Sequence, residues 1–184
     1  MNPTIIIPVY NHPRVAEVIT EARILGLPII VVDDGSDDET RTVLASVSDI
    51  VLLRHPKNQG KGAALLTGFT TALALSHDAA LTIDADGQHQ PKDGMKLLTV
   101  AAKECALVLG WRQGMAGEHV PWTSRFGRGF SNFWVWACGG PWVHDSQSGF
   151  RLYPLPESLN LGVRARRYQF EVEILVLANQ RGLS

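Results

Sequence analysis

Residues 4–34, TIIIPVYNHPRVAEVITEARILGLPIIVVDD, contain two short apolar runs with a helical pattern between them. The β-branched run Thr4–Val9 predicts a buried strand, and Ile29–Val32 predicts another. The apolar residues between the runs recur at helical spacing and stop at Gly26: Val15, Val18, Ile19, Ala22 and Leu25. This strand–helix–strand pattern predicts parallel strands joined by a right-handed crossover.

The same alternation continues along the chain. It predicts strands at 50–53, 79–83 and 106–109, and helices at 40–46, 60–75 and 92–103. After Gly110 the regular alternation of strand and helix patterns ends. We expect a helix at 123–137, a strand at 149–153 and a final helix at 168–180. The predicted fold class is α/β: a single domain over residues 1–184, with a mostly parallel sheet covered by helices on both faces.

Composition narrows the function classes. The chain has 184 residues, 45% of them apolar, with 17 Lys and Arg against 18 Asp and Glu. This balance argues against the basic surface of a nucleic-acid-binding protein. The cysteines Cys105 and Cys138 form no disulfide framework, which favours a reduced, cytoplasmic setting. There is no signal-peptide pattern and no apolar run of about 18 residues, so we expect a soluble or membrane-peripheral protein.

Polar side chains follow three of the predicted strands. Tyr10 and Asn11 follow the first strand, Asp33 and Asp34 the second, and the sequence Asp84-Ala85-Asp86 the fourth. In a parallel α/β sheet, ligands bind beyond the carboxyl ends of the strands. The sequence therefore predicts a crevice lined by carboxylates at this edge of the sheet.

The strongest local signal is residues 82–89, TIDADGQH. Two carboxylates one residue apart, at the end of a buried strand, are costly unless a cation neutralises them. Mg²⁺ or Mn²⁺ would fit, since both prefer oxygen ligands and often bridge to substrate phosphates. Gln88 would add a carbonyl oxygen. The alternative is an exposed Asp-rich turn with Gly87 at a positive φ.

Residues 58–62, NQGKG, precede a predicted helix. Backbone N–H groups and Lys61 would suit a phosphate or nucleotide there. A helix-capping glycine explains the pattern equally well. The segment lacks the first glycine and the Ser/Thr of a Walker A loop.

Five motifs in this order resemble the family 2 glycosyltransferases, and within them the branch that glycosylates polyprenyl or dolichyl phosphates. The motifs are PVYN (8–11), VDDGS (32–36), NQGKG (58–62), DADGQH (84–89) and SGFR (148–151). The resemblance implies a GT-A fold, a GDP- or UDP-sugar donor and a divalent metal ion. It also implies an inverting transfer, with a polyprenyl phosphate as the favoured acceptor.

The resemblance also implies roles for individual residues. Pro8, Tyr10, Asp33 and Asp34 would hold the base and ribose, with Lys61 near the nucleotide. Asp84, Asp86 and Gln88 would coordinate the metal, and Arg125 and Arg151 would contact phosphates of donor or acceptor. A metal ion and arginines placed there would stabilise the charge that builds on the departing diphosphate.

The resemblance also implies that an acidic residue in this region acts as general base when the acceptor is a hydroxyl, and Asp145 is the candidate for that role. A lipid phosphate is already ionised near neutral pH and needs little base help, so Asp145 would then only position groups. A turn role explains Asp145 equally well. The alternatives to the phosphate acceptor are a saccharide hydroxyl and a non-catalytic nucleotide-sugar-binding domain. A sugar nucleotidyltransferase would show a Gly-rich basic signature near its first strand, which residues 4–13 lack.

The region from Phe126 to Trp142 is rich in aromatic residues. A core stripe is the preferred interpretation, and a flank for a lipid acceptor or a membrane contact is the alternative. The aromatic residues are Phe126, Phe130, Phe133, Trp134, Trp136 and Trp142. Because related chains normally continue beyond the last predicted helix, we also expect this catalytic domain to lack a C-terminal continuation.

Overall fold

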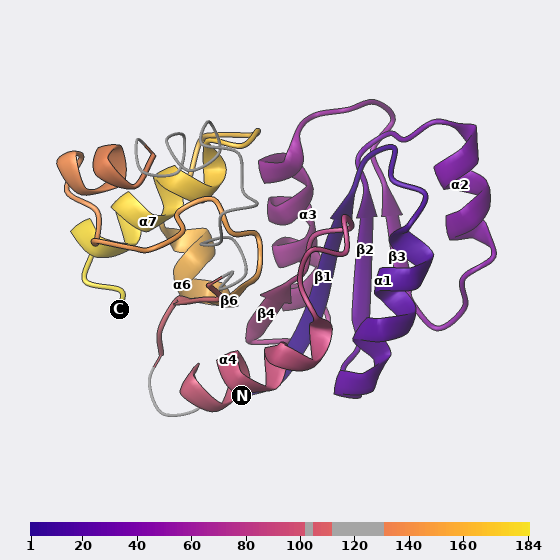
Figure 1. Cartoon of the computed structure of the whole chain (residues 1–184), viewed down its shortest axis with the longest axis horizontal. Coiled ribbons are helices and arrows are strands. Elements are labelled where there is room, and N and C mark those ends of the chain that lie inside the picture. The colour runs from indigo at the N-terminus through magenta and orange to yellow at the C-terminus, as the bar shows by residue number, and fades with distance from the viewer. Residues whose placement is uncertain (102–104, 112–130) are drawn as a thin grey trace, which may run out of the picture.

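The structure is a computed structural model that describes residues 1–101, 105–111 and 131–184. Its centre is a six-stranded sheet in the order β3-β2-β1-β4-β6-β5 (Figure 1). The strands are β1 (Pro3–Val9), β2 (Ile29–Asp33), β3 (Val51–Arg54), β4 (Ala79–Thr82), β5 (Val108–Leu109) and β6 (Arg151–Pro154). The strands β1 to β4 pair in parallel, which confirms the predicted α/β class.

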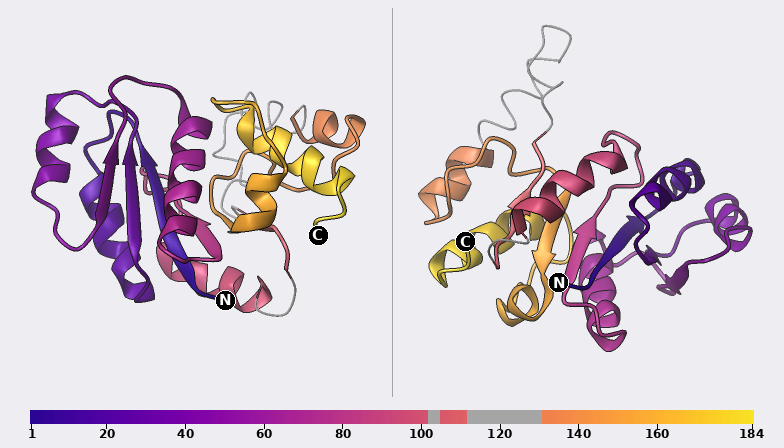
Figure 2. Two further views of the ribbon diagram at one scale, coloured as in Figure 1. Left: turned by 180° about the vertical axis from the view of Figure 1, so that it is seen from behind. Right: turned by 90° about the horizontal axis from the view of Figure 1, so that it is seen from below.

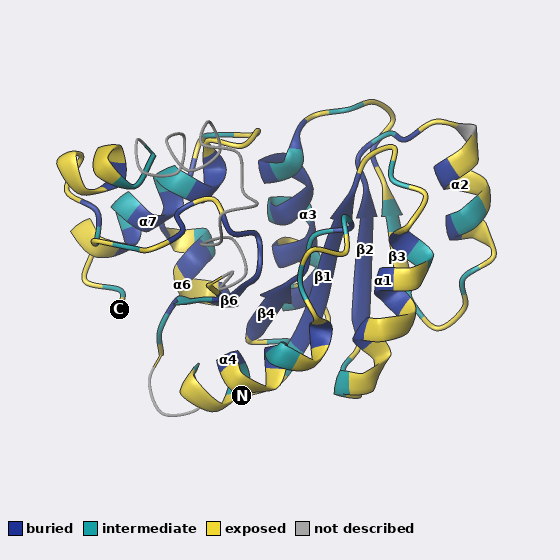
Figure 3. Cartoon of the chain, in the orientation of Figure 1, coloured by how far each residue is buried: buried dark blue, intermediate teal, exposed yellow. Residues whose placement is uncertain are grey.

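The alternating side chains of β1 explain why helices cover both faces of the sheet. Ile5 and Ile7 belong to one buried cluster and Ile6 to the other, because successive side chains of a strand point to opposite faces. Figure 2 shows α3 and α6 on one side of the strands, with α1 and α4 on the other. Strands β1, β2, β4 and β6 are almost wholly buried, whereas the edge strand β3 is mostly exposed (Figure 3).

Most helices lie where the sequence predicts them. They are α1 (Val15–Ala22), α2 (Asp38–Ala45), α3 (Lys61–Ala74), α4 (Gly94–Ala101), α6 (Leu155–Asn160) and α7 (Phe170–Gln180), with 3-10 turns η1 (Arg23–Leu25) and η2 (Pro91–Asp93). The α1–η1 pair ends at Gly26 with a φ of 63°, the left-handed cap that glycine permits. Helix α6 was not predicted.

The direction and place of β6 differ from the expected pattern. It runs antiparallel to β4 and to β5 and lies between them, so β5 is not the neighbour of β4. Local sequence indicates a strand but carries no information on its direction or partners. This insertion brings residues 145–150 beside the carboxyl end of β4, since Thr82 pairs with Arg151.

The core interpretation of the aromatic region is wrong for the residues that the structure describes. Residues 131–137 are helical, and within 131–142 the exposed aromatic side chains are Phe133, Trp134, Trp136 and Trp142. Only Val135 of residues 133–136 is buried. Phe126 and Phe130, with the expected start of this helix, lie outside the described residues. Within the described part of the chain, no helix has the length and apolar character needed to cross a bilayer.

Candidate active site

A cleft of about 350 Å³ opens at the carboxyl ends of β1, β2 and β4. The chain leaves β1 toward β2 on one side, and β4 pairs on the other side of β1. This is the switch point at which doubly wound sheets bind ligands. Six of the residues predicted from the sequence line this cleft together: Pro8, Tyr10, Asp34, Lys61, Asp84 and Asp86.

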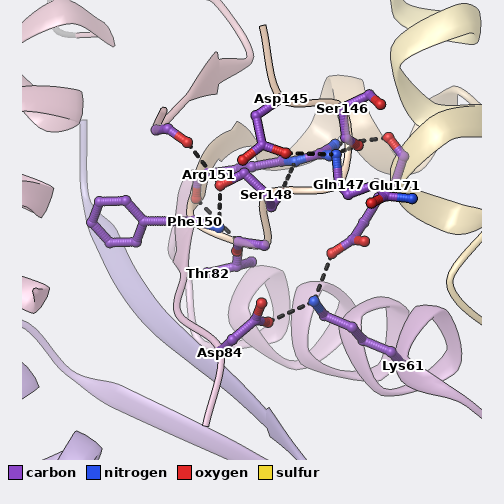
Figure 4. A network of polar contacts seen from close by, with 12 residues as sticks. Lys61, Thr82, Asp84, Asp145, Ser146, Gln147, Ser148, Phe150, Arg151 and Glu171 are labelled. Carbon is purple, nitrogen blue, oxygen red and sulfur yellow. Dashed lines mark hydrogen bonds and ion pairs between the residues drawn. The ribbon is translucent and has the colours of Figure 1, made fainter. Parts of the chain in front are cut away.

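Asp84 lines the cleft, two residues beyond the end of β4. The Nζ of Lys61 lies 2.6 Å from Asp84 Oδ1 and 2.6 Å from Glu171 Oε1 (Figure 4). Burial alone would lower the pKa of Lys61, but the two carboxylates outweigh burial and raise this pKa above its ordinary value. Lys61 therefore carries a positive charge between two negative ones.

Asp86 and Gln88 form the turn that follows Asp84. The main-chain N–H of Gln88 donates to Asp86 Oδ1 at 2.9 Å, and Gly87 has a φ of 70°. The turn expected as the alternative to a metal site is therefore present. Gln88 is exposed and is not among the residues that line the cleft, so the metal ligands predicted here come together only as Asp84 and Asp86.

The two carboxylates suit a divalent cation that completes its coordination with substrate phosphates. Mg²⁺ sites of this kind use one or two carboxylates rather than a full protein cage. Gly149 makes room for one of them, since a Cβ at this position would overlap the Asp84 carboxylate. Within residues 1–101, 105–111 and 131–184, no cluster of three or more His, Cys, Asp or Glu forms a complete protein-only site.

Asp34 lines the cleft, but its carboxylate is engaged by the protein. It accepts the N–H groups of Gln59 at 2.9 Å and Gly60 at 2.7 Å, and His55 Nδ1 lies 2.6 Å from its Oδ1. Two main-chain N–H groups of the NQGKG segment therefore donate to the Asp34 carboxylate of the protein itself. A phosphate in that place would have to displace Asp34.

Asp33 does not reach the cleft. Its carboxylate is fully buried and accepts the N–H of Ser36 at 2.9 Å. Arg54 Nε forms an ion pair with the other oxygen at 2.7 Å. The position of Asp33 therefore differs from the predicted contact with base or ribose, because this strand-end carboxylate points into the sheet's own turn.

Arg151 also differs from its predicted place beside a phosphate. Its side chain is fully buried, and its guanidinium donates to the carbonyl oxygens of Ser148, Glu171 and Ser146 at 2.6, 2.9 and 2.7 Å. It ties the loop before β6 to the start of α7 (Figure 4). Arg125 lies outside the described residues.

Asp145 lies in the same loop and is 4% exposed. The N–H of Gln147 donates to its Oδ1 at 3.3 Å, which is the local contact of a turn. Asp145 is not among the residues that line the cleft. This placement favours the structural alternative for Asp145 over a general base.

The structure adds cleft residues that sequence reasoning missed. Arg167 and Tyr168 line the cleft from the segment before α7, and His12 lines it from the loop after β1. His12 Nδ1 is buried with no hydrogen-bond partner among the described residues, so it is a polar atom that a ligand would satisfy. The basic run 164–167 was the available signal, but nothing local places it beside β1.

These features define an α/β protein with a cleft and a pair of carboxylates at the switch point of its sheet. Comparison with known families matches residues 4–155 to "Glycosyl transferase family 2", and the chain belongs to this family. It has the GT-A fold and is a nucleotide-sugar-dependent glycosyltransferase. The sugar nucleotidyltransferase alternative is therefore wrong.

Sequence similarity to known proteins covers nearly the whole chain. It is 30% identical to a UDP-N-acetylglucosamine–dolichyl-phosphate N-acetylglucosaminyltransferase from Methanococcus voltae, over 98% of this chain and 81% of that protein. It is 29% identical to a polyprenol monophosphomannose synthase from Mycolicibacterium smegmatis, over 98% of this chain and 73% of that protein. A nucleotidyl transferase from Methanothermobacter thermautotroptrophicus is similar in structure, with a TM-score of 0.60, 14% identity, and coverage of 98% and 83%. That likeness concerns the fold alone.

Proposed function

We propose that this protein transfers a sugar from a GDP- or UDP-sugar to a polyprenyl phosphate, with inversion at the sugar carbon and with Mg²⁺ or Mn²⁺ bound. The observation that carries the proposal is that Asp84 and Asp86 both line the switch-point cleft. Inversion follows if the acceptor oxygen displaces the nucleoside diphosphate in a single step.

Different residues of the cleft would bind the cation, the nucleoside and the phosphates. Asp84 and Asp86 would hold the cation, which when bound supplies a Lewis acid for the leaving diphosphate. Tyr10, exposed by 50%, and Tyr168, exposed by 77%, offer aromatic surfaces for a nucleoside. Arg167 at the same cleft offers a fixed fork of donors for phosphate oxygens.

A phosphate acceptor is supported by the placement of Asp145 and by the named relatives. A phosphate oxygen is already ionised and needs no base, whereas a hydroxyl acceptor does. Asp145, the sequence candidate for that base, is buried in a turn outside the cleft lining. The names of the relatives include a dolichyl phosphate acceptor and a polyprenol product.

The exposed aromatic residues support an acceptor that resides in a membrane. Phe133, Trp134, Trp136 and Trp142 form the aromatic patch, in which ring centroids lie 5.7 to 6.4 Å apart. Tryptophan is enriched where proteins meet the interface of a bilayer, because its ring is apolar and its N–H remains hydrated. We therefore place the enzyme at the membrane surface that carries its lipid acceptor.

The test is transfer of radiolabelled sugar from GDP- and UDP-sugars to a short polyprenyl phosphate, with Asp86→Ala as the variant. Among the described residues, the Asp86 carboxylate has a local contact, with the N–H of Gln88, so the variant should keep its melting temperature. It should lose Mn²⁺-dependent donor binding by about 100-fold, since one of two cation ligands is removed. Asp93→Ala, which removes an exposed carboxylate paired with Lys96, is the matched control.

Two outcomes would contradict the proposal. If Asp86→Ala binds Mn²⁺ and donor as well as the parent protein does, the assignment of Asp84 and Asp86 as metal ligands is wrong. Transfer to a saccharide hydroxyl with none to polyprenyl phosphate would sink the acceptor assignment and leave the donor assignment standing.

A further inference from the structure

Glu171, in the first turn of α7, is a buried carboxylate that the proposed chemistry does not use. It is 4% exposed, and its Oε1 lies 2.6 Å from Lys61 Nζ. The same ammonium lies 2.6 Å from Asp84 Oδ1, so one cation is shared between two carboxylates (Figure 4). Lys61 therefore connects α7 to the Asp84 carboxylate that lines the cleft.

The position of Glu171 is fixed from the other side by Arg151. Arg151 Nη1 donates to the main-chain carbonyl of Glu171 at 2.9 Å, and Nη2 donates to that of Ser146 at 2.7 Å. The loop that begins at Ser146 includes Gly149, against which the Asp84 carboxylate lies. One buried arginine thus holds both the helix that carries Glu171 and the loop beside Asp84.

The sharing of the ammonium has an electrostatic consequence for Asp84. A positive charge at Asp84 Oδ1 opposes a divalent cation that approaches the same carboxylate. Glu171 competes for this ammonium and draws it toward α7. The more firmly Glu171 holds Lys61, the more of the Asp84 charge remains available to a cation.

We propose that Glu171 is a positioning residue that sets the divalent-cation affinity of Asp84 by holding the Lys61 ammonium. The proposal rests on the proposed function only in that Asp84 and Asp86 bind a cation. It differs from that function because Glu171 and Lys61 are not ligands. The site without Glu171 would keep Asp84 but pair it fully with Lys61.

The experiment measures binding of Mn²⁺ alone, by electron paramagnetic resonance of the free ion, to the whole chain. Glu171→Gln should weaken binding about tenfold, because charge-assisted contacts of this kind are the strong ones. Lys61→Met should tighten binding by roughly threefold or more, because the opposing charge is removed. In the Lys61→Met background, Glu171→Gln should change the affinity less than about threefold, since no ammonium remains to be held.

Controls separate this mechanism from misfolding and from general loss of charge. Glu157→Gln removes an exposed carboxylate on α6, which lies away from the cleft lining, and should leave Mn²⁺ affinity unchanged. Glu171→Asp keeps the charge but shortens the side chain, so it should fold and show an intermediate loss. Melting temperatures of all variants are measured in parallel.

Each result decides between the two proposals. If Asp86→Ala weakens Mn²⁺ binding but Glu171→Gln does not, this inference is overturned and the metal site stands. The same holds if Glu171→Gln acts equally in both Lys61 backgrounds. If neither the parent nor Lys61→Met binds Mn²⁺, both the metal assignment and this inference fail.

Discussion

At the scale of single residues, the position of the Asp84 carboxylate depends on close contacts with two neighbours, Gly149 and Lys61. The Asp84 carboxylate rests on Gly149 and faces the Lys61 ammonium. The buried glycine is therefore a steric requirement for the position of the carboxylate. This explains why the SGFR motif, which begins 64 residues after Asp84, belongs to the same site.

Gly149→Ala should test this requirement. The added methyl would overlap the end of a side chain, so Asp84 can rotate away and the fold can survive. We expect Mn²⁺ and donor binding to fall at least about tenfold, with a stability loss within the 1–3 kcal/mol typical of overpacking. Binding is measured by calorimetry and stability by urea unfolding.

Gly162→Ala is the control for that variant. Gly162 has a φ of 62° and open space around it, so alanine there strains the backbone without touching the cleft. This substitution should lower the free energy of unfolding by about 1 kcal/mol and leave Mn²⁺ and donor binding unchanged. Equal binding losses in both variants would mean that Gly149 acts only through stability.

At the scale of elements, the site depends on how closely α3 meets the segment before α7. The N–H of Ala63 donates to the carbonyl of Arg166 at 2.9 Å, and a Cβ on Gly62 would lie 2.7 Å from Phe170 Cβ and 2.9 Å from the carbonyl oxygen of Ala165. Glu173 fastens the same segment by accepting the N–H groups of Arg164 and Ala165. These contacts present Arg167 and Tyr168 to the cleft.

Gly62→Ala should therefore separate these elements. Its methyl would meet main-chain atoms, which cannot turn aside as the end of a side chain can, so we expect a loss of about 2–3 kcal/mol in the free energy of unfolding. Thr70→Ala, at an exposed position of the same helix, should change this free energy by less than about 0.5 kcal/mol. The urea midpoints of the Gly62→Ala and Thr70→Ala variants are compared. Equal midpoints would contradict the close approach of α3 to the segment before α7.

At the scale of the whole molecule, the exposed aromatic patch lies at the opposite end from α2. Figure 1 shows the helical residues 131–137 beyond α7, and Figure 3 colours most of these residues as exposed. A cluster of large exposed aromatic rings is unusual on a surface that meets only water. The proposed membrane contact gives this end of the molecule a function.

The double variant Trp136→Ser with Trp142→Ser should weaken binding to vesicles of phosphatidylcholine with a minor fraction of phosphatidylglycerol. Burying one such side chain is worth about 1.5–3 kcal/mol, so we expect at least a tenfold loss in a sedimentation assay. Ile24→Ser, at a position exposed by 73% elsewhere on the surface, is the control. Unchanged vesicle binding by the double variant would rule out the patch as the membrane contact.

The sequence by itself determined the strands, most helices, the carboxylates at the strand ends and the family. These follow from local rules: β-branched runs form buried strands, apolar periodicity forms helices, and parallel strands place their carboxyl ends at one edge. Pro8, Tyr10, Asp34, Lys61, Asp84 and Asp86 were predicted for one crevice on that basis or by resemblance, and they line one cleft.

Only the tertiary structure decided which of these groups face a ligand and which serve the fold. Asp33 and Arg151 have the chemistry of binding residues, yet both are buried and bonded to the protein. The antiparallel place of β6 and the contact of Glu171 with Lys61 also escaped prediction, and the exposure of Trp136 and Trp142 was anticipated only as an alternative to core packing. Pairing across 110 residues, strand direction and burial all depend on contacts between distant segments, which no local pattern of residue types encodes.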